Sequence, residues 1–207
     1  MSFNYFVKSK NSIEKPFVLL TFDDGPDRNT TPIILDVLKD FNVTAIFFVI
    51  GIKAKKEQHL IKRIIEEGHF IGNHTASHPP LFALLSAAKV EKEINELTAF
   101  FTTLEMESNL FRPPIGYTNP IISRVVNKLN LNLIGWNKRS YDTVIRNPKV
   151  LSNRLVSLSK PGSIILLHDN LKQTALALKP FLELSSQKGI TFANKEQINL
   201  YLNEKNM

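Results

Sequence analysis

Residues 17–26 read Phe-Val-Leu-Leu-Thr-Phe-Asp-Asp-Gly-Pro, an apolar run that ends in two adjacent carboxylates and a turn signal. The apolar part, 17–22, predicts a buried strand. Adjacent residues on a straight strand point to opposite faces, so we expect the turn at Gly25-Pro26 to bring Asp23 and Asp24 into one site. One carboxylate could then bind a cation while the other accepts a proton from a bound water. The alternative is an Asp-rich turn that only caps the next helix.

A second cluster, His-Thr-Ala-Ser-His, occupies residues 74–78. On a helix, residues four apart share a face, so His74 and His78 could converge on one metal ion. Thr75 stands where the zinc proteases carry a Glu, so the base must come from elsewhere, and the carboxylate pair is the obvious source. Two His and one carboxylate leave a coordination position open for water, as catalytic sites do. The alternative is a pair of surface or capping histidines.

The rest of the chain alternates between strand-like and helical patterns. Strand-like runs lie at residues 17–22, 44–50, 69–72, 110–112, 131–136, 163–167 and 189–192. Amphipathic stretches at helical period lie between them at 31–41, 53–67, 86–104, 120–129, 148–158, 171–186 and 195–202. Seven strands alternating with helices predict a parallel sheet covered by helices, either open or closed into a barrel.

Chain length favours a single domain, residues 1–207, with its core over about 16–205. A chain of 207 residues with 43% hydrophobic content can bury a substantial core. We find no internal repeat, low-complexity segment or linker that would mark a second domain.

The polar candidates fall at the carboxyl ends of the predicted strands. Besides the two clusters above, Arg112 ends the fourth strand, Trp136 ends the fifth and His168 follows the sixth. In a barrel-like β/α fold those ends share one rim, which is where such folds build their active sites.

Four motifs in order resemble those of the polysaccharide deacetylases of carbohydrate esterase family 4, the NodB homology domain. They are Thr-Phe-Asp-Asp-Gly-Pro (21–26), His-Thr-Ala-Ser-His (74–78), Arg-Pro-Pro-Ile-Gly (112–116) and Leu-Leu-His-Asp (166–169). The resemblance covers nearly the whole chain, from about residue 16. It implies an α/β fold of TIM-like type, a distorted (β/α)7 barrel with parallel strands and a groove for a glycan across its top.

The resemblance also implies roles for the catalytic residues. Asp24, His74 and His78 match the metal triad, and we expect one divalent ion there, Zn²⁺ with Co²⁺ as the alternative. Asp23 matches the base that deprotonates the attacking water. His168 matches the acid that protonates the leaving sugar amine, although a His at this place could merely cap the next helix.

Other matched positions concern support and substrate. Arg112 is expected to hold Asp23 by a charge-assisted contact, the alternative being a surface Arg in a rigid loop. The backbone N–H of Ile115 matches an oxyanion donor. Trp136 is assigned to substrate binding, and Leu166 matches a residue that lines the acetyl-methyl pocket, although a buried strand Leu needs no such explanation.

Two motifs depart from the family pattern. The third usually carries Tyr where Ile115 stands, so side-chain stacking on a sugar ring is lost while the backbone donor survives. In a further motif at residues 136–143, between the third and the last of those above, Arg139 stands where the first Asp is expected and Thr143 replaces a Trp. Asp142 remains, and we assign it to the catalytic machinery as a partner of His168 or Arg112.

Two further histidines, His59 and His69, are interpreted as structural.

Composition excludes or disfavours several kinds of site. Without cysteine, neither a disulfide nor a thiolate metal site is available. The net charge of +7 is spread along the chain at helix-surface spacing, which favours a solvated surface over nucleic-acid binding.

The N-terminus has no apolar core of signal-peptide length, and no window approaches ~18 apolar residues, so no membrane span is predicted. As written, the chain is expected to be cytoplasmic. It would belong to the cell envelope or be secreted if an export segment has been removed.

The expected activity is hydrolysis of the C–N amide bond of N-acetylglucosamine units in a peptidoglycan or chitin-like glycan. The partner is thus an acetylated glycan, and the oligomeric state is left open. One alternative keeps the chemistry but changes the substrate, to O-acetyl xylan or small aryl acetates. Another is a glycan-binding protein that has lost turnover because the motif at residues 136–143 is altered.

Overall fold

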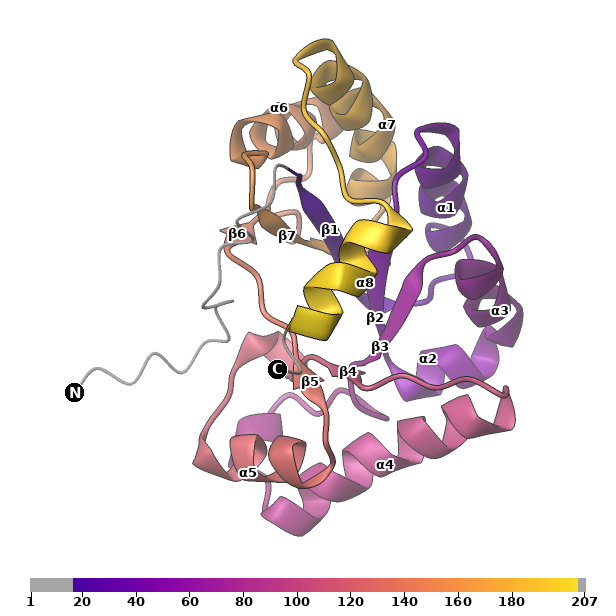
Figure 1. The fold of residues 1–207 in the computed structure, drawn as a ribbon, viewed down its shortest axis with the longest axis vertical. Coiled ribbons are helices and arrows are strands. Elements are labelled where there is room, and N and C mark those ends of the chain that lie inside the picture. The colour runs from indigo at the N-terminus through magenta and orange to yellow at the C-terminus, as the bar shows by residue number, and fades with distance from the viewer. Residues whose placement is uncertain (1–16, 205–207) are drawn as a thin grey trace, which may run out of the picture.

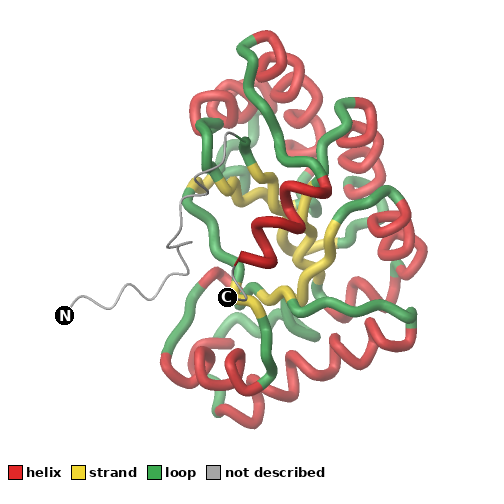
Figure 2. The backbone as a smooth tube through the Cα atoms, viewed as in Figure 1, coloured by secondary structure: helices red, strands yellow, loops and turns green. Residues whose placement is uncertain are grey.

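The computed structural model describes residues 17–204, and its strands form one seven-stranded sheet in which every pairing is parallel (Figures 1 and 2). The strands are β1 (Leu19–Gly25), β2 (Ala45–Val49), β3 (Phe70–Asn73), β4 (Leu110–Phe111), β5 (Asn132–Leu133), β6 (Lys138–Arg139) and β7 (Ile164–His168). Their order is β5-β4-β3-β2-β1-β7-β6. The sheet curls into a half-barrel with helices packed on it, which confirms the predicted distorted (β/α)7 barrel.

Helices connect the strands at nearly the predicted places. They are α1 (Thr31–Asp40), α2 (Gly51–Lys56), α3 (Gln58–Glu66), α4 (Ala87–Thr103), α5 (Pro120–Lys128), α6 (Pro148–Leu158), α7 (Lys172–Gln187) and α8 (Lys195–Glu204), with short 3-10 helices η1 (Phe82–Leu84) and η2 (Pro114–Gly116). The predicted helix 53–67 is in fact two helices. Glu57 separates them because its backbone (φ −118°, ψ 47°) lies outside the helical region.

Strand alternation divides the interior into two faces. In β1, Leu20 and Phe22 pack against the outer helices, whereas Leu19 belongs to a cluster inside the curled sheet. Helix α8 closes the inner side: its Ile198 and Leu202 pack in that inner cluster, and Figure 1 shows the helix lying across the strands. The polar residues at the carboxyl ends of the strands therefore lie on the rim, above this apolar layer.

The seventh strand differs from the prediction. Residues 189–192 make only a single bridge, Val18 with Phe192, whereas β6 is a two-residue strand paired with β7. Its sequence, Lys138-Arg139, has no apolar signal because β6 is a terminal strand of the sheet, where charged residues remain in contact with water.

Two expectations concern the chain's ends and the membrane. The expectation about a leader falls on residues 1–16, which lie outside the described residues. Within residues 17–204, the helices are too short or too polar to cross a membrane.

Candidate active site

A β-bulge at the carboxyl end of β1 brings the carboxylates of Asp23 and Asp24 to one place. Asp23 pairs with Phe48 and Gly25 with Val49, so Asp24 is an extra residue in the strand, with φ +72°. The His74 Nε2 atom consequently lies 3.8 Å from Asp23 Oδ2 and 3.5 Å from Asp24 Oδ1. The convergence was predicted, but its predicted cause, the Gly25-Pro26 turn, was wrong: the bulge reorients Asp24 one residue earlier.

The two histidines converge from a loop and not from one face of a helix. Residues 74–78 follow β3 without helical structure, and Thr75 and His78 have positive φ values of 70° and 53°. The Thr75 hydroxyl accepts a hydrogen bond from the His78 N–H at 3.0 Å, which closes the loop. The imidazole rings of His74 and His78 lie 4.9 Å apart between centroids.

Asp24, His74 and His78 form a three-ligand set that fits a divalent metal ion. Asp24 Oδ1 lies 3.5 Å from the Nε2 atom of each histidine, and the three ligand atoms lie within 4.8 Å of one another. Zn²⁺ bonds of roughly 2.0–2.1 Å would place tetrahedral ligand atoms about 3.3 Å apart. His74 Nδ1 lies 2.7 Å from the Arg112 carbonyl, to which it donates, so its Nε2 carries the free lone pair that metal binding requires.

The charge states of the triad suit a cation. Burial raises the pKa of Asp24, but the hydrogen bond and charge of His74, with smaller contributions from His168 and His78, lower it well below its usual range. Burial and the neighbouring His74 lower the pKa of His78. Near neutral pH, Asp24 is therefore an ionised carboxylate and His78 a neutral imidazole, the forms in which these side chains bind a metal ion.

Asp23 is held by a fully buried arginine. Arg112 Nη1 donates to Asp23 Oδ1 at 2.6 Å, while its Nε and Nη2 donate to the carbonyls of Ile134 (3.0 Å) and Gly135 (3.1 Å). Burial lowers the pKa of Arg112, against the charge of Asp23, but an arginine keeps its proton in proteins. A fixed cation thus faces one oxygen of Asp23 and leaves the other toward His74.

His168, the last residue of β7, is bound to Asp142. The imidazole Nδ1 lies 2.8 Å from Asp142 Oδ1, and Asp142 Oδ2 accepts from the His168 backbone N–H at 2.7 Å and from Thr174 Oγ1 at 2.9 Å. Of the two partners weighed for Asp142, the structure places it on His168. Burial lowers the pKa of His168, but Asp142, with smaller contributions from Asp23 and Asp24, raises it to about 9.

The third motif forms the 3-10 helix η2 on the rim. Ile115 is 59% exposed and has φ +62°, and its backbone N–H makes no hydrogen bond within residues 17–204. Gly116 lies under the Trp136 ring, since a Cβ on it would come within 1.8 Å of a ring carbon. Trp136 is half-buried and also lies 5.3 Å from the Arg112 guanidinium, so it packs on the site's framework.

The remaining predicted positions take different places. Leu166 is buried in β7, on the face that also carries His168 two residues later. His69 lies at the amino end of β3, the opposite end from His74, and His59 is exposed on α3. Thr143 is exposed in the turn after Asp142.

Sequence reasoning missed Asp169, which joins β7 to β1. Its Oδ2 accepts from Thr31 Oγ1 at 2.7 Å, and its carboxylate fills the space beside Gly25, where a Cβ would lie 2.0 Å from Oδ2. Burial raises its pKa to about 7, against the hydrogen bond from Thr31. The signal was present, because a Gly directly after two Asp residues indicates close approach of another group.

Sequence reasoning also missed the start of α2, which forms hydrogen bonds both to the histidine loop and to Asp24. The Gly51 and Ile52 N–H groups donate to the carbonyls of Thr75 (3.0 Å) and Ala76 (2.8 Å), inside the histidine loop. The next residue, Lys53, donates from Nζ to the Asp24 carbonyl at 2.6 Å. We call residues 51–53 the α2 clamp. Nothing in their sequence distinguishes Lys53 from the surface lysines that follow it.

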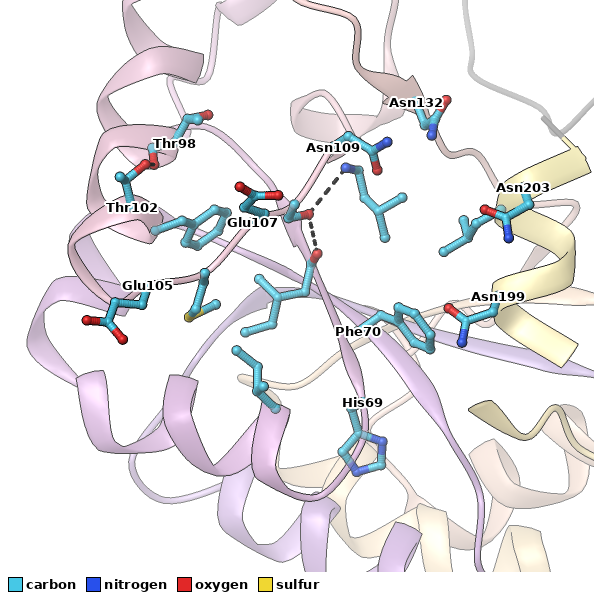
Figure 3. A pocket seen from close by; sticks show the side chains of 17 residues that line it. His69, Phe70, Thr98, Thr102, Glu105, Glu107, Asn109, Asn132, Asn199 and Asn203 are labelled. Atoms are coloured by element: carbon cyan, nitrogen blue, oxygen red, sulfur yellow. Dashed lines mark hydrogen bonds between the residues drawn. The ribbon is translucent and has the colours of Figure 1, made fainter. Parts of the chain in front are cut away.

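A cavity of about 760 Å³, whose lining Figure 3 shows, lies away from this site. It is lined by the first residues of three strands, Phe70, Leu110 and Asn132, together with Asn199 and Asn203 of α8. These positions mark the amino ends of β3, β4 and β5, opposite the rim that carries the triad. The cavity contains none of the predicted site residues.

Comparison with known proteins identifies the family. A family model described as polysaccharide deacetylase matches residues 10–134. A peptidoglycan-N-acetylglucosamine deacetylase of Bacillus cereus is 35% identical over 190 residues, which are 89% of this chain and 88% of that protein. PgdA, a peptidoglycan-N-acetylglucosamine deacetylase of Listeria monocytogenes, is 33% identical over 187 residues, but the match spans only 38% of its length.

Among solved structures, the peptidoglycan deacetylase PdaC from Bacillus subtilis matches with a TM-score of 0.83 and 28% identity, over 93% of this chain and 94% of that one. The chain therefore belongs to the polysaccharide deacetylase family, the carbohydrate esterases with a NodB homology domain.

Proposed function

We propose that this deacetylase hydrolyses the N-acetyl group of N-acetylglucosamine units in peptidoglycan or a chitin-like glycan and releases acetate and a free amine. The observation that carries the proposal is the single oxygen, Asp24 Oδ1, lying 3.5 Å from the Nε2 atoms of both His74 and His78. The family to which the protein belongs, and the substrates in the names of its relatives, support the choice of a glycan amide.

The metal centre is assigned to Asp24, His74 and His78. A divalent ion held there would lower the pKa of a bound water and polarise the acetyl carbonyl. We propose Zn²⁺ because two imidazoles and one carboxylate are its usual catalytic ligands, with Co²⁺ as the alternative.

Asp23 is assigned as the base that takes the proton from the attacking water. Its Oδ1 is occupied by Arg112, whereas Oδ2 is directed toward His74 and the triad. The charge-assisted bond to Arg112 aims this carboxylate and restricts its rotation. Both properties help a carboxylate that must accept a proton at a defined position.

His168 is assigned as the acid that protonates the leaving nitrogen. An amide needs this step because an unprotonated amine is a poor leaving group. With its pKa raised to about 9, the imidazole carries a proton at neutral pH, and Asp142 fixes the ring through Nδ1, so Nε2 is left to donate.

Substrate contacts are assigned to the rim. The N–H of Ile115, which has no partner among the described residues, would donate to the oxyanion that develops on the acetyl carbonyl. Leu166 would contact the acetyl methyl group, and Trp136 would form part of the groove wall.

Acetate release tests the proposal. We expect the metal-replete protein to release acetate from peptidoglycan fragments or chitooligosaccharides faster than from acetylated xylan or aryl acetates. His168→Ala should slow amide hydrolysis about 10²–10⁴-fold, and ester hydrolysis less, because an alkoxide leaves more easily than an amide anion. Faster turnover of the esters would favour the O-acetyl alternative. Binding of glycan without turnover would favour the non-catalytic one.

A further inference from the structure

Next to His168, the proposed acid, lies a cationic surface made of Arg139, Tyr141 and Arg154, which we call the basic rim. Arg139 pairs in register with Leu166, and residues paired in a parallel sheet direct their side chains to the same face. Leu166 shares its face of β7 with His168. Arg139 therefore projects from the edge strand β6 on the side that carries the proposed acid, and it is exposed.

The guanidinium groups of the basic rim are held in place. Tyr141 is 45% exposed, and its ring centroid lies 5.2 Å from the Arg139 Cζ and 4.8 Å from the Arg154 Cζ. Arg154, from α6, donates to the carbonyls of Ser140 (2.7 Å) and Arg139 (3.1 Å). Tyr141 directly precedes Asp142, the partner of His168, so the rim borders the reacting end of the site.

The positive charge of the rim is not neutralised. Within the described part of the chain, neither Arg139 nor Arg154 forms an ion pair with an acidic residue. Asp142, the carboxylate next to Tyr141 in sequence, is 1% exposed and already accepts three hydrogen bonds, from His168 and Thr174. Arg139 is exposed and Arg154 is half-buried, and two guanidiniums without a protein anion offer the planar donors that a carboxylate matches.

We infer that the basic rim is a subsite for a carboxylate on the glycan strand, so that the enzyme selects an acidic glycan over a neutral one. This deepens the proposed function and rests on it. In peptidoglycan, the sugar next to each N-acetylglucosamine carries a lactyl ether whose carboxylate is free or extended by a peptide. Chitin-like glycans have no such group. Arg139 is the specificity-determining residue of this subsite.

The test uses two oligosaccharides of equal length, peptidoglycan strands stripped of their peptides, with free lactyl carboxylates, and chitooligosaccharides. Dissociation constants are measured by calorimetry on the full chain, and kcat/KM is measured from acetate release. We expect Arg139→Gln to weaken binding of the acidic strand about tenfold and to change binding of the neutral one less than twofold. Lys188→Gln, which removes an exposed charge at the far end of α7 from His168, should change neither.

Two results would overturn the inference: equal weakening of both glycans by Arg139→Gln, or no weakening of either. Arg139→Lys, which keeps the charge but not the planar donors, should retain part of the preference and guards against a folding defect. Failure of the proposed function would look different, because the wild-type protein would then release no acetate from either glycan while the binding difference at Arg139 persisted.

Discussion

Asp24, Thr75, His78 and Ile115 share a backbone property that no sequence pattern revealed: each has a positive φ. Such values are uncommon outside glycine and unusual for a β-branched residue such as Ile115 or Thr75. Each costs on the order of 1–3 kcal/mol and is retained where surrounding structure enforces it. The sequence predicted which side chains converge, because their types and spacing indicate metal chemistry. The bulge and the loop that bring them together depend on backbone conformations that Asp, His and Ile do not favour.

Replacing Asp23 by Asn tests its assignment as the base. Because Asn cannot accept the proton, kcat should fall about 10²–10⁴-fold, while binding of the metal ion stays within a few-fold of wild type. Acetate-release kinetics and metal titration on the same sample separate the two effects. Retention of wild-type kcat would remove Asp23 from the catalytic machinery.

Replacing Asp142 by Asn tests the partner of His168. Asp142 is the main cause that raises the pKa of His168, so the variant should lower that pKa. The proposed acid acts while protonated, so activity is lost as pH rises through its pKa, and this loss should begin at a lower pH in the variant. The pH profile of kcat/KM measures it. An unchanged alkaline limb would show that His168 does not act as the acid.

At the scale of elements, the strand and helix patterns were predictable where apolar periodicity was strong. Strands β1, β2 and β7 and helices α4 to α7 lie within a few residues of the predicted bounds. Prediction failed where tertiary contacts decide: at Glu57, which interrupts a continuous helical pattern, and at β6, whose two charged residues carry no strand signal. The α2 clamp belongs to the same class, because its function comes from where α2 packs.

The α2 clamp makes a prediction about metal affinity. Lys53→Met removes the hydrogen bond to the carbonyl of Asp24, whose backbone conformation is strained, so the metal ion should bind roughly 10–100-fold more weakly. Lys56→Met, an exposed lysine at the end of the same helix, is the matched control and should leave affinity unchanged. Calorimetric titration of the folded variants distinguishes them. Equal affinities would mean that Lys53 does not position Asp24.

For the whole molecule, we propose that the rim at the carboxyl ends of the strands carries the chemistry, whereas the opposite end contributes stability. His69 illustrates the second role. It is 8% exposed at the amino end of β3, and its Nδ1 accepts from the Ala45 N–H at 3.3 Å. Burial lowers its pKa to about 4, against the charge of Glu67. Placing His69 among the structural residues remains a prediction, and stability at different pH values tests it.

Acidification should destabilise the fold through His69. Below its unfolded pKa of about 6.5 the unfolded chain takes up a proton that the folded chain does not take up until about pH 4, so stability falls as pH falls through this window. Between pH 7.5 and 5 the wild type should lose roughly 2 kcal/mol more unfolding free energy than His69→Gln, which cannot titrate. Urea unfolding across this range measures it. Parallel pH dependences would show that His69 does not contribute.

The central claim is that Asp24, His74 and His78 jointly hold one ion, and metal titration tests it most directly. Calorimetric addition of Zn²⁺, repeated with Co²⁺ to follow its visible absorption, should give one ion per chain for the wild type. The His78→Ala variant should bind much more weakly, while His59→Ala, an exposed histidine, should match the wild type. If the wild type bound no ion, or if His78→Ala bound it as tightly as the wild type, the account of this active site would be contradicted.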